Sequence, residues 1–275
     1  MISIGEAWRV ARQTVDSLDA RLLVQHVVGC SHADLIAHPE RLLLAGQAAR
    51  IDELVGRRAG GEPLAYLFGS AYFCGLEFLV TPAVLVPRPD TELLVELAVE
   101  LLRPLPAPRV VDLGTGSGVV AVSISCLCPS AIVTAVDLSP AALKVAARNA
   151  ERHAPGVRFV AGDWYSPLAD ARFDMIVANP PYVAYGDPHL ALDGLPFEPR
   201  MALTDGVPGG NGLACIRAIA EGAIAHLLPG GWLLLEHGYN QAADVRKLLQ
   251  QQGLSDVASW PDLAMVERVS AGRLR

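Results

Sequence analysis

The sequence lacks an excess of basic residues, which argues against nucleic acid as its main partner. Its 22 Lys and Arg residues are outnumbered by 29 Asp and Glu residues, and its net charge is −7. A protein that neutralises many phosphates usually carries a basic stripe. The modest group formed by Arg50, Arg57 and Arg58 is interpreted as a solvated helix face. We therefore expect no direct sequence-specific binding of nucleic acid.

Signals for a membrane, an export route or a metal are also missing. No apolar stretch reaches the ~18 residues that a membrane helix needs, and Glu6 and Arg9 stand where a signal peptide would be apolar. The five cysteines are scattered and odd in number, which suits a reducing compartment. Cys126 and Cys128 are one residue apart, which is not zinc-site spacing and favours core packing. We expect a cytoplasmic protein with no membrane contact and no metal.

The length and patterning predict two unequal domains joined by a linker. The chain has 275 residues, of which 52% are hydrophobic, enough for more than one core. Residues 1–60 repeat apolar side chains at helical spacing and predict a small helical bundle. Residues 61–90 are expected to form a β-hairpin linker, and residues 91–275 the main α/β domain.

The linker is recognised by short strand-like runs. These runs lie at residues 66–68, 71–73 and 76–80, and Gly69 and Gly75 interrupt them. Glycine between short runs of aromatic and aliphatic residues is typical of a hairpin.

From residue 109 onward, apolar strands alternate with helices. Alternation of this length predicts a mostly parallel sheet with helices on both faces. The last two expected strands have no helix between them, so the final strand is expected to run antiparallel. The expected strands lie at 110–113, 132–136, 157–160, 175–177 and 232–235 and near 257 and 266, and the helices at 119–126, 141–152, 213–225 and 242–251.

A glycine-rich turn follows the first strand of the expected sheet and opens a helix. It reads Asp112-Leu113-Gly114-Thr115-Gly116-Ser117-Gly118. Glycines permit a tight turn and a close approach of ligand to backbone, while the helix N–H groups remain free to bind it. The dinucleotide fingerprint would require glycine in place of Val119, which disfavours an NAD-dependent dehydrogenase.

Two further strand ends complete a predicted nucleoside site. Asp137 ends the second strand, where an acid can accept both ribose hydroxyls; a helix cap before Ser139 is the alternative. Asp163 and Trp164 follow the third strand and offer an acid and a flat ring for an adenine. The carboxyl ends of parallel strands lie along one edge, where such sheets bind ligands.

The fourth strand ends in Asn179-Pro180-Pro181-Tyr182. The prolines alone would end a strand, and Tyr182 alone would suit a core. Together, however, the four residues offer what an NH₂ group needs. The Asn179 side-chain oxygen and the Pro180 carbonyl can accept its two N–H bonds, and Tyr182 can stack on a planar group. These acceptors would stabilise positive charge that develops on the nitrogen when it acts as a nucleophile.

The combination resembles the class I methyltransferase fold, and more closely the HemK/PrmC family. The resemblance covers nearly the whole chain, including its helical N-terminal part. Besides the loop at 179–182, it is carried by residues 61–66, 85–92, 197–199, 235–238 and 267–269. One local departure, Met265-Val266, lies in a turn without predicted site residues.

The family methylates the glutamine side chain in the Gly-Gly-Gln motif of peptide chain release factors. The resemblance therefore implies S-adenosylmethionine as cofactor and a release factor as the protein partner. It implies that Asn179 to Tyr182 bind the glutamine and that the helical domain helps to hold the release factor. The cofactor contacts implied are Gly114, Thr115, Gly116, Ser117, Gly118, Asp137, Asp163, Trp164 and Asn179.

Two other functions remain open from the sequence. A methyltransferase acting on an exocyclic amino group of RNA or DNA would use the same four residues, although the acidic charge argues against DNA. A cofactor-binding protein without catalysis is disfavoured because Asn179 and Tyr182 are both present.

Overall fold

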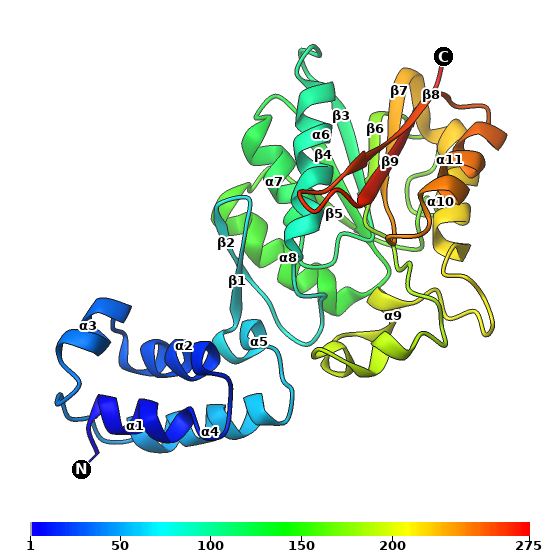
Figure 1. The fold of residues 1–275 in the computed structure, drawn as a ribbon. Coiled ribbons are helices and arrows are strands. Elements are labelled where there is room, and N and C mark those ends of the chain that lie inside the picture. Colours follow the sequence, from blue (N-terminus) through cyan, green and yellow to red (C-terminus); the bar gives the residue numbers. More distant parts are fainter. Residues whose placement is uncertain (1) are drawn as a thin grey trace. The chain divides into compact units, whose positions relative to one another are not determined.

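The computed structural model describes residues 2–275, which divide into two compact units between residues 69 and 70. The first unit is entirely helical in its regular structure (Figure 1). Its helices are α1 (Ile4–Ala11), α2 (Ser17–Val28), α3 (His32–Ala37), α4 (Gln47–Ala59) and α5 (Leu64–Phe68). They close on a core whose fully buried side chains include Ile4, Leu23, Leu35, Ile51 and Leu54.

Short-range capping defines the helices of this unit. Ser3 and Ser31 each accept the N–H of the residue three positions on, and the acid at that position bonds back, which completes a capping box. Gly29 ends α2 in the left-handed conformation at a φ of 68°. Local chemistry therefore explains why the sequence already indicates this bundle.

Residues 66–68 are helical, so the prediction of a strand there is wrong. Pro63 precedes α5 and Gly69 ends it at a φ of 74°. Leu67 is buried in the helical core, and Leu64 and Phe68 pack against it; this spacing of three and one is helical. The first unit therefore continues through α5, and the predicted division at residue 60 falls inside it, just after α4.

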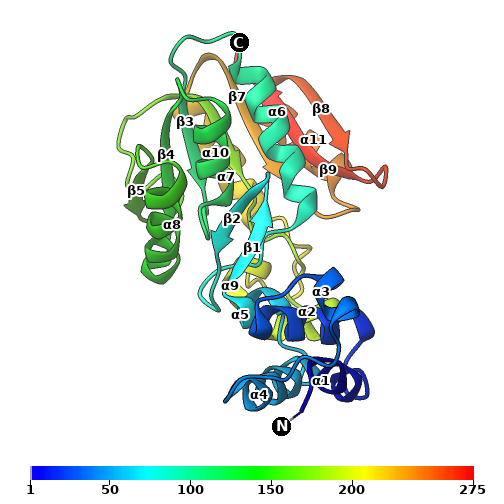
Figure 2. The ribbon, with the colours of Figure 1, turned by 90° about the vertical axis from the view of Figure 1, so that its left-hand side faces the viewer.

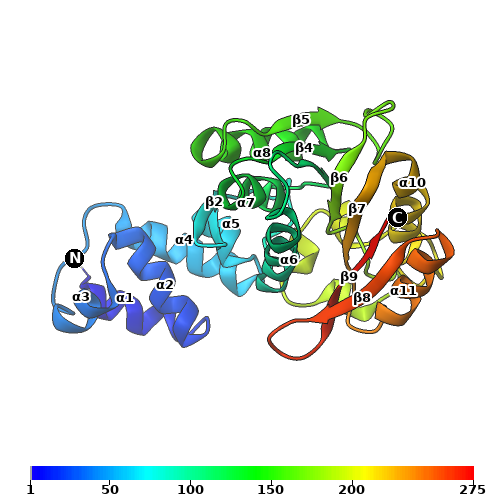
Figure 3. The same cartoon turned by 90° about the horizontal axis from the view of Figure 1, so that it is seen from above.

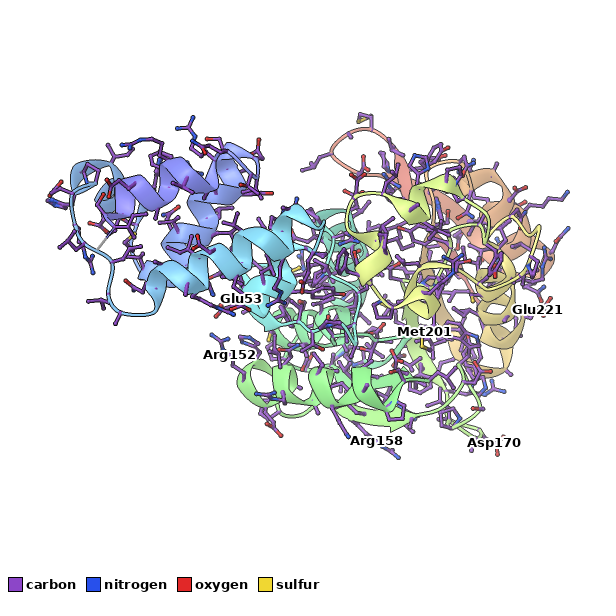
Figure 4. All side chains as sticks on the ribbon, turned by 90° about the horizontal axis from the view of Figure 1, so that it is seen from below. Glu53, Arg152, Arg158, Asp170, Met201 and Glu221 are labelled. Atoms are coloured by element: carbon purple, nitrogen blue, oxygen red, sulfur yellow. The ribbon has the colours of Figure 1, made fainter. Side chains whose placement is uncertain are left out.

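The second unit begins with the predicted hairpin, β1 (Ser70–Phe73) and β2 (Leu76–Leu79). Its two-residue turn places both Cys74 and Gly75 at positive φ, as hairpins of this length require. A side chain of the following domain fixes it: Asn149 accepts the Leu79 N–H at 2.7 Å and donates to the Leu79 carbonyl at 3.0 Å. Arg152, marked in Figure 4, pairs with Glu77 at 2.9 Å.

A seven-stranded sheet organises the rest of residues 70–275, and it is mostly parallel, as predicted. Figure 2 shows β5, β4 and β3 side by side toward one edge and β8 and β9 at the other. The order is β5-β4-β3-β6-β7-β9-β8, in which β9 runs antiparallel to both neighbours. The strands are β3 (Arg109–Leu113), β4 (Ile132–Asp137), β5 (Arg158–Ala161), β6 (Phe173–Ala178), β7 (Leu227–Glu236), β8 (Ser255–Pro261) and β9 (Glu267–Arg273).

Helices cover both faces of this sheet (Figure 3). Alternate residues of β3 point to opposite faces of the sheet, so Val110 packs with the helices on one face and Val111 with those on the other. The first face carries α6 (Glu92–Leu102), α7 (Val119–Leu127) and α8 (Pro140–His153); the second carries α10 (Ala214–His226) and α11 (Ala242–Gln251).

The chain between β6 and β7 contains short helical elements that the periodicity does not predict. They are the 3₁₀ turns η2 (Pro188–Ala191) and η3 (Leu195–Phe197) and the one-turn helix α9 (Arg200–Leu203). A further 3₁₀ turn, η1 (Pro89–Thr91), precedes α6. Within residues 2–275, none of the helices combines the length and the apolarity needed to cross a bilayer.

Candidate active site

The glycine-rich turn joins β3 to α7 with three left-handed glycines, Gly114, Gly116 and Gly118, at φ of 76°, 56° and 84°. The N–H groups of Gly114 and Thr115 both donate to the Val136 carbonyl, at 2.9 and 3.0 Å. A Cβ on Gly118 would lie 3.1 Å from the Ala146 Cβ, so glycine there also lets α7 approach α8. The turn is thus held to the end of β4 by its own backbone.

Asp112, on β3, holds this turn through its side chain. Its side chain is fully buried, and its Oδ2 accepts the Thr115 hydroxyl at 2.6 Å. Burial raises the pKa of Asp112 to about 7, the nearby charge of Asp137 adds to the rise, and the Thr115 hydroxyl opposes it. Asp112 therefore titrates near neutrality.

Asp137 lies beside the turn and is held by two backbone groups. Its Oδ2 accepts the Gly116 N–H and its Oδ1 the Ser139 N–H, both at 2.8 Å. Burial raises the pKa of Asp137, and these two hydrogen bonds oppose the rise. The N-cap of α8 is Ser139, which accepts the Ala142 N–H at 3.2 Å. Asp137 therefore faces the turn and does not itself cap α8.

Asp163 and Trp164 follow β5 and lie at the same end of the sheet. Trp164 has a φ of 43°, and its ring comes within 3.3 Å of the position that a Cβ on Gly114 would occupy. The flat ring and the glycine turn therefore lie against each other.

The Asn179-Pro180-Pro181-Tyr182 loop continues from β6, the strand next to β3. The Asn179 Nδ2 donates to the Thr91 hydroxyl at 3.1 Å. The Tyr182 hydroxyl donates to Glu236 Oε1 at 3.2 Å. The carbonyl of Tyr182 accepts the side-chain amide of Gln241 at 3.0 Å. Side chains from three other segments thus hold this loop.

One cavity of about 530 Å³ connects the glycine turn with the Asn179 loop, a size typical of small-molecule sites. It also reaches α9, where Met201 is marked in Figure 4. The predicted site residues that line it are Gly114, Thr115, Gly116, Ser117, Asp137, Asp163, Trp164, Asn179 and Pro181. Gly118, Pro180 and Tyr182 do not line it. Pro180 is buried, and the ring of Tyr182 packs against the core on the face of the sheet that α10 and α11 cover.

Several residues of this site have no role that the sequence alone predicts. Thr91 and Arg88 also line the cavity, and Arg88 forms an ion pair with the buried Glu198, which also accepts the Val86 N–H at 2.8 Å. Glu236 lies behind the loop. The sequence signal that could identify Glu236 is its position directly after the apolar run at 232–235, because an acid at the end of a buried strand is rarely buried without a partner.

Within residues 2–275, no group of three or more His, Cys, Asp and Glu side chains is arranged to hold a metal ion.

Known proteins resemble the chain in both of its parts. Residues 10–69 match the family described as PrmC N-terminal domain, and residues 90–192 the family described as Methyltransferase small domain. The 16S rRNA methyltransferase RsmC of T. thermophilus, solved with AdoMet and guanosine, has a TM-score of 0.56 at 23% identity. That comparison covers 75% of this chain and 50% of the other, and it shows the methyltransferase fold.

Two relatives match over almost the full length. The release factor glutamine methyltransferase of Bordetella pertussis (strain Tohama I) is 53% identical over 258 residues, which is 94% of each chain. That of Burkholderia pseudomallei (strain K96243) is 52% identical over 267 residues, or 94% of this chain and 93% of the other. The resemblance inferred from the motifs is confirmed: the chain belongs to the family of release factor glutamine methyltransferases.

Proposed function

We propose that this protein transfers a methyl group from S-adenosylmethionine to the side-chain nitrogen, N5, of the glutamine in a release factor's Gly-Gly-Gln motif. The named activity of the full-length relatives supports this assignment. The observation that carries it is that one cavity contains both Asp137, at the end of β4, and Asn179, after β6. The reaction is proposed to take place in the cytoplasm, where release factors act.

The glycine-turn end of the cavity fits the nucleoside part of this cofactor. Each oxygen of Asp137 accepts one backbone N–H. A carboxylate has about four acceptor positions, so one remains on each oxygen for a ribose hydroxyl. Trp164 offers a flat apolar face beside Gly114, where an adenine ring would lie. Asp163 and the remaining residues of the turn would complete this end.

When bound, the cofactor would supply an electrophilic methyl group on its sulfonium. The chain's task is then to make an amide nitrogen nucleophilic. The lone pair of an amide is delocalised, as the ~18–20 kcal/mol rotation barrier of the peptide bond shows. Asn179 Oδ1 and the Pro180 carbonyl are proposed to accept the two N–H bonds, which orients the nitrogen and stabilises its developing positive charge.

The proline pair would keep these acceptors in place. Neither Pro180 nor Pro181 has an N–H, and both have a restricted φ. On taking the methyl group from the sulfonium, which would leave as a neutral thioether, the nitrogen would lose one proton to solvent, and no ionised base would be required in the loop. Acceptance of an N–H by the Pro180 carbonyl and stacking of Tyr182 on the glutamine amide stay predictions, since neither residue lines the cavity and the Tyr182 hydroxyl bonds Glu236.

The direct test is incubation of the purified full chain with isotopically labelled S-adenosylmethionine and a purified release factor. We expect one labelled methyl group, which peptide mass spectrometry places on the Gly-Gly-Gln glutamine. A release factor with Ala in place of that glutamine is the matched control and should stay unlabelled. Ribosomal RNA and DNA are offered in parallel incubations; label on either of them, with none on the release factor, would establish the alternative amino-group methyltransferase and overturn the proposal.

The helical first unit is proposed to hold the release factor outside its modified loop. It matches the PrmC N-terminal family over residues 10–69, and no predicted cofactor residue lies within it. Its surface exposes apolar side chains that a protein partner would cover: Val10, Leu18, Ile36, Leu42 and Leu44.

Exchange of exposed apolar residues tests this docking role in the full chain. Leu44 is 67% exposed, and a Leu44→Asp, Ile36→Asp double variant should weaken binding of the intact release factor while leaving methylation of a short Gly-Gly-Gln peptide unchanged. Leu263→Asp in the second unit, where Leu263 is fully exposed, is the control for a charge added elsewhere. Equal loss on the peptide and the intact factor would contradict docking.

A further inference from the structure

Two buried polar side chains lie behind the Asn179 loop and are not used in the reaction proposed above. Thr91, at the end of η1, is 2% exposed, and Glu236, at the end of β7, is 1% exposed. Thr91 contacts Asn179 at 3.1 Å, and Glu236 contacts the Tyr182 hydroxyl at 3.2 Å. Each therefore touches one end of the same four-residue loop.

The direction of each hydrogen bond follows from the chemistry of the groups. The Asn179 Nδ2 only donates, so the Thr91 oxygen must accept. The proton of the Thr91 hydroxyl then needs an acceptor of its own, and the facing group is the Glu236 carboxylate, whose ionised form that hydroxyl stabilises. Glu236 Oε2 is fully covered and has no hydrogen-bond partner at a normal bonding distance and angle among residues 2–275, so it is the acceptor still open to that proton.

The geometry points to Thr91 and Glu236 as positioning residues that fix which end of the Asn179 amide faces the methyl acceptor. Glu236 accepts the Thr91 proton, Thr91 accepts from the Asn179 Nδ2, and the Asn179 Oδ1 is thereby left toward the cavity that Asn179 lines. This inference rests on the proposed function, because it assigns a purpose to that oxygen.

The orientation matters because the two ends of an amide have opposite roles. With Oδ1 toward the cavity, Asn179 can accept an N–H of the glutamine amide. With the amide turned over, its NH₂ would face another NH₂, and two donors would meet without an acceptor. Asparagine has no internal preference between these states, so the choice must come from its neighbours. Among residues 2–275, the hydrogen-bond partner of the Asn179 side chain is the Thr91 hydroxyl, and its oxygen distinguishes the two states when its proton is held by Glu236.

The charge of Glu236 determines how well this arrangement works. Burial raises the pKa of Glu236 to about 7; the hydroxyls of Thr91 and Tyr182 oppose the rise, Asp90 adds to it, and Arg268 lowers it. Arg268 is shared with Asp90 and Asp262, at 3.3 and 3.0 Å. A protonated Glu236 would donate instead of accepting, and the Thr91 proton would then compete with the Asn179 NH₂.

Kinetics of Thr91 variants test the inference. We expect Thr91→Val, which keeps the shape and removes the hydroxyl, to lower single-turnover methylation by about 10- to 100-fold, as loss of a supporting hydrogen bond does elsewhere. Cofactor affinity should change less than threefold, on the order of a surface substitution. Thr91→Ser restores the hydroxyl and should recover most of the rate. Thr134→Val, on β4 and outside the cavity, is the matched control.

The pH profile separates positioning from a merely structural role. The wild-type rate should rise with pH through about 7 as Glu236 ionises, whereas Glu236→Gln should be slow and lack this limb. Melting temperatures establish that each variant is folded. If Thr91→Val and Glu236→Gln were folded and as fast as wild type, the inference would be wrong while the proposed function stood.

A readout without turnover covers the case in which the proposed function fails. The side-chain NH₂ of Asn179, assigned in ¹⁵N spectra by its loss in Asn179→Asp, should exchange its protons more slowly than exposed amides. Thr91→Val should remove this protection and Thr91→Ser should keep it. Equal exchange in all three proteins would overturn the positioning role, and a wild-type enzyme that methylates no release factor would overturn only the function.

Discussion

The two ends of the cavity are built by different means. At the glycine turn the contacts are made by backbone groups, as when the Gly116 and Ser139 N–H groups both donate to Asp137. At the Asn179 loop side chains supply the partners: Thr91 and Glu236 bond other side chains, and Gln241 bonds the Tyr182 carbonyl. Backbone contacts persist under most substitutions, whereas side-chain contacts are lost with one residue. We therefore expect the first end to tolerate change and the second to be sensitive to it.

The largest effect is expected at the loop itself. Asn179→Ala should lower single-turnover methylation of a release factor by about 10²–10³, as loss of one preorganised acceptor or donor does. Cofactor affinity should fall less, because the contact strengthens chiefly in the transition state. Asn179→Asp should retain measurable turnover, since it keeps an acceptor oxygen but loses the donor to Thr91. Near-normal chemistry in the Ala variant, at saturating cofactor, would remove Asn179 from the mechanism.

Each end also contains one buried acid, and both acids should make stability depend on pH. Burial raises the pKa of Asp112 from 3.8 and of Glu236 from 4.5, each to about 7. Between these values the folded protein binds more protons than the unfolded chain, so the free energy of unfolding falls as pH rises toward 7. Each acid should contribute a few kcal/mol to this fall, since one pKa unit corresponds to about 1.4 kcal/mol.

Denaturant titrations from pH 4 to 8 measure this dependence. Glu236→Gln and Asp112→Asn should each flatten the slope over the same window. A slope that stays unchanged in either variant would show that the acid in question keeps an ordinary pKa.

At the glycine-turn end, Asp137→Ala should weaken cofactor binding by roughly 2–3 kcal/mol, because hydrogen bonds to a charged acceptor are lost. The variant also frees the Gly116 N–H, which Asp137 accepts at 2.8 Å. Calorimetry with S-adenosylmethionine gives the affinity, and Asp170→Ala, at an exposed position, is the control. An unchanged dissociation constant in a folded variant would leave Asp137 with a purely structural role.

The smallest effect is expected when one glycine at each end of the cavity is replaced by alanine. Gly116 and Gly212 both have positive φ, 56° and 78°. A Cβ on Gly116 would meet nothing within 4 Å, whereas one on Gly212 would lie 2.1 Å from the Tyr182 carbonyl oxygen. Gly212→Ala should therefore destabilise the protein by about 1–3 kcal/mol more than Gly116→Ala, from overpacking. Equal unfolding midpoints would show that the Tyr182 loop moves aside at little cost and that the two ends of the cavity do not differ in their sensitivity to substitution.

The same contrast explains what the sequence reveals. Gly116, in the turn after β3, and Asp137, at the end of the neighbouring parallel strand β4, are 21 residues apart, so strand–helix alternation is enough to place them together. Asn179 and Thr91 are 88 residues apart, and Tyr182 and Glu236 are 54 apart. Pairing at those separations depends on strand order and on side-chain direction, which neither periodicity nor spacing supplies. The motif at 179–182 is visible in the sequence, but its supports are not.

Elsewhere the local sequence is misleading or incomplete. Residues 66–68 have the aromatic and aliphatic character of a strand, yet packing of Leu67 in the helical core makes them a helix. An antiparallel last strand is predicted and observed, but its insertion between β7 and β8 is not predicted. Where a strand is inserted depends on how the neighbouring strands pack, and the apolar pattern of one strand does not specify its neighbours.

The position of β9 has a consequence for how the protein is made. Glu236 pairs in register with Val269 of β9, and Arg268, whose charge lowers the pKa of Glu236, is the neighbouring residue. Synthesis runs from the N-terminus at about 5–20 residues per second, so β3 to β6 and the glycine turn emerge well before β9. Until β9 is inserted between β7 and β8, Glu236 lacks its paired strand and the neighbouring charge of Arg268. The proposed support behind Asn179 is therefore complete only after β9, which follows the other six strands of this sheet in the sequence, has been synthesised and inserted.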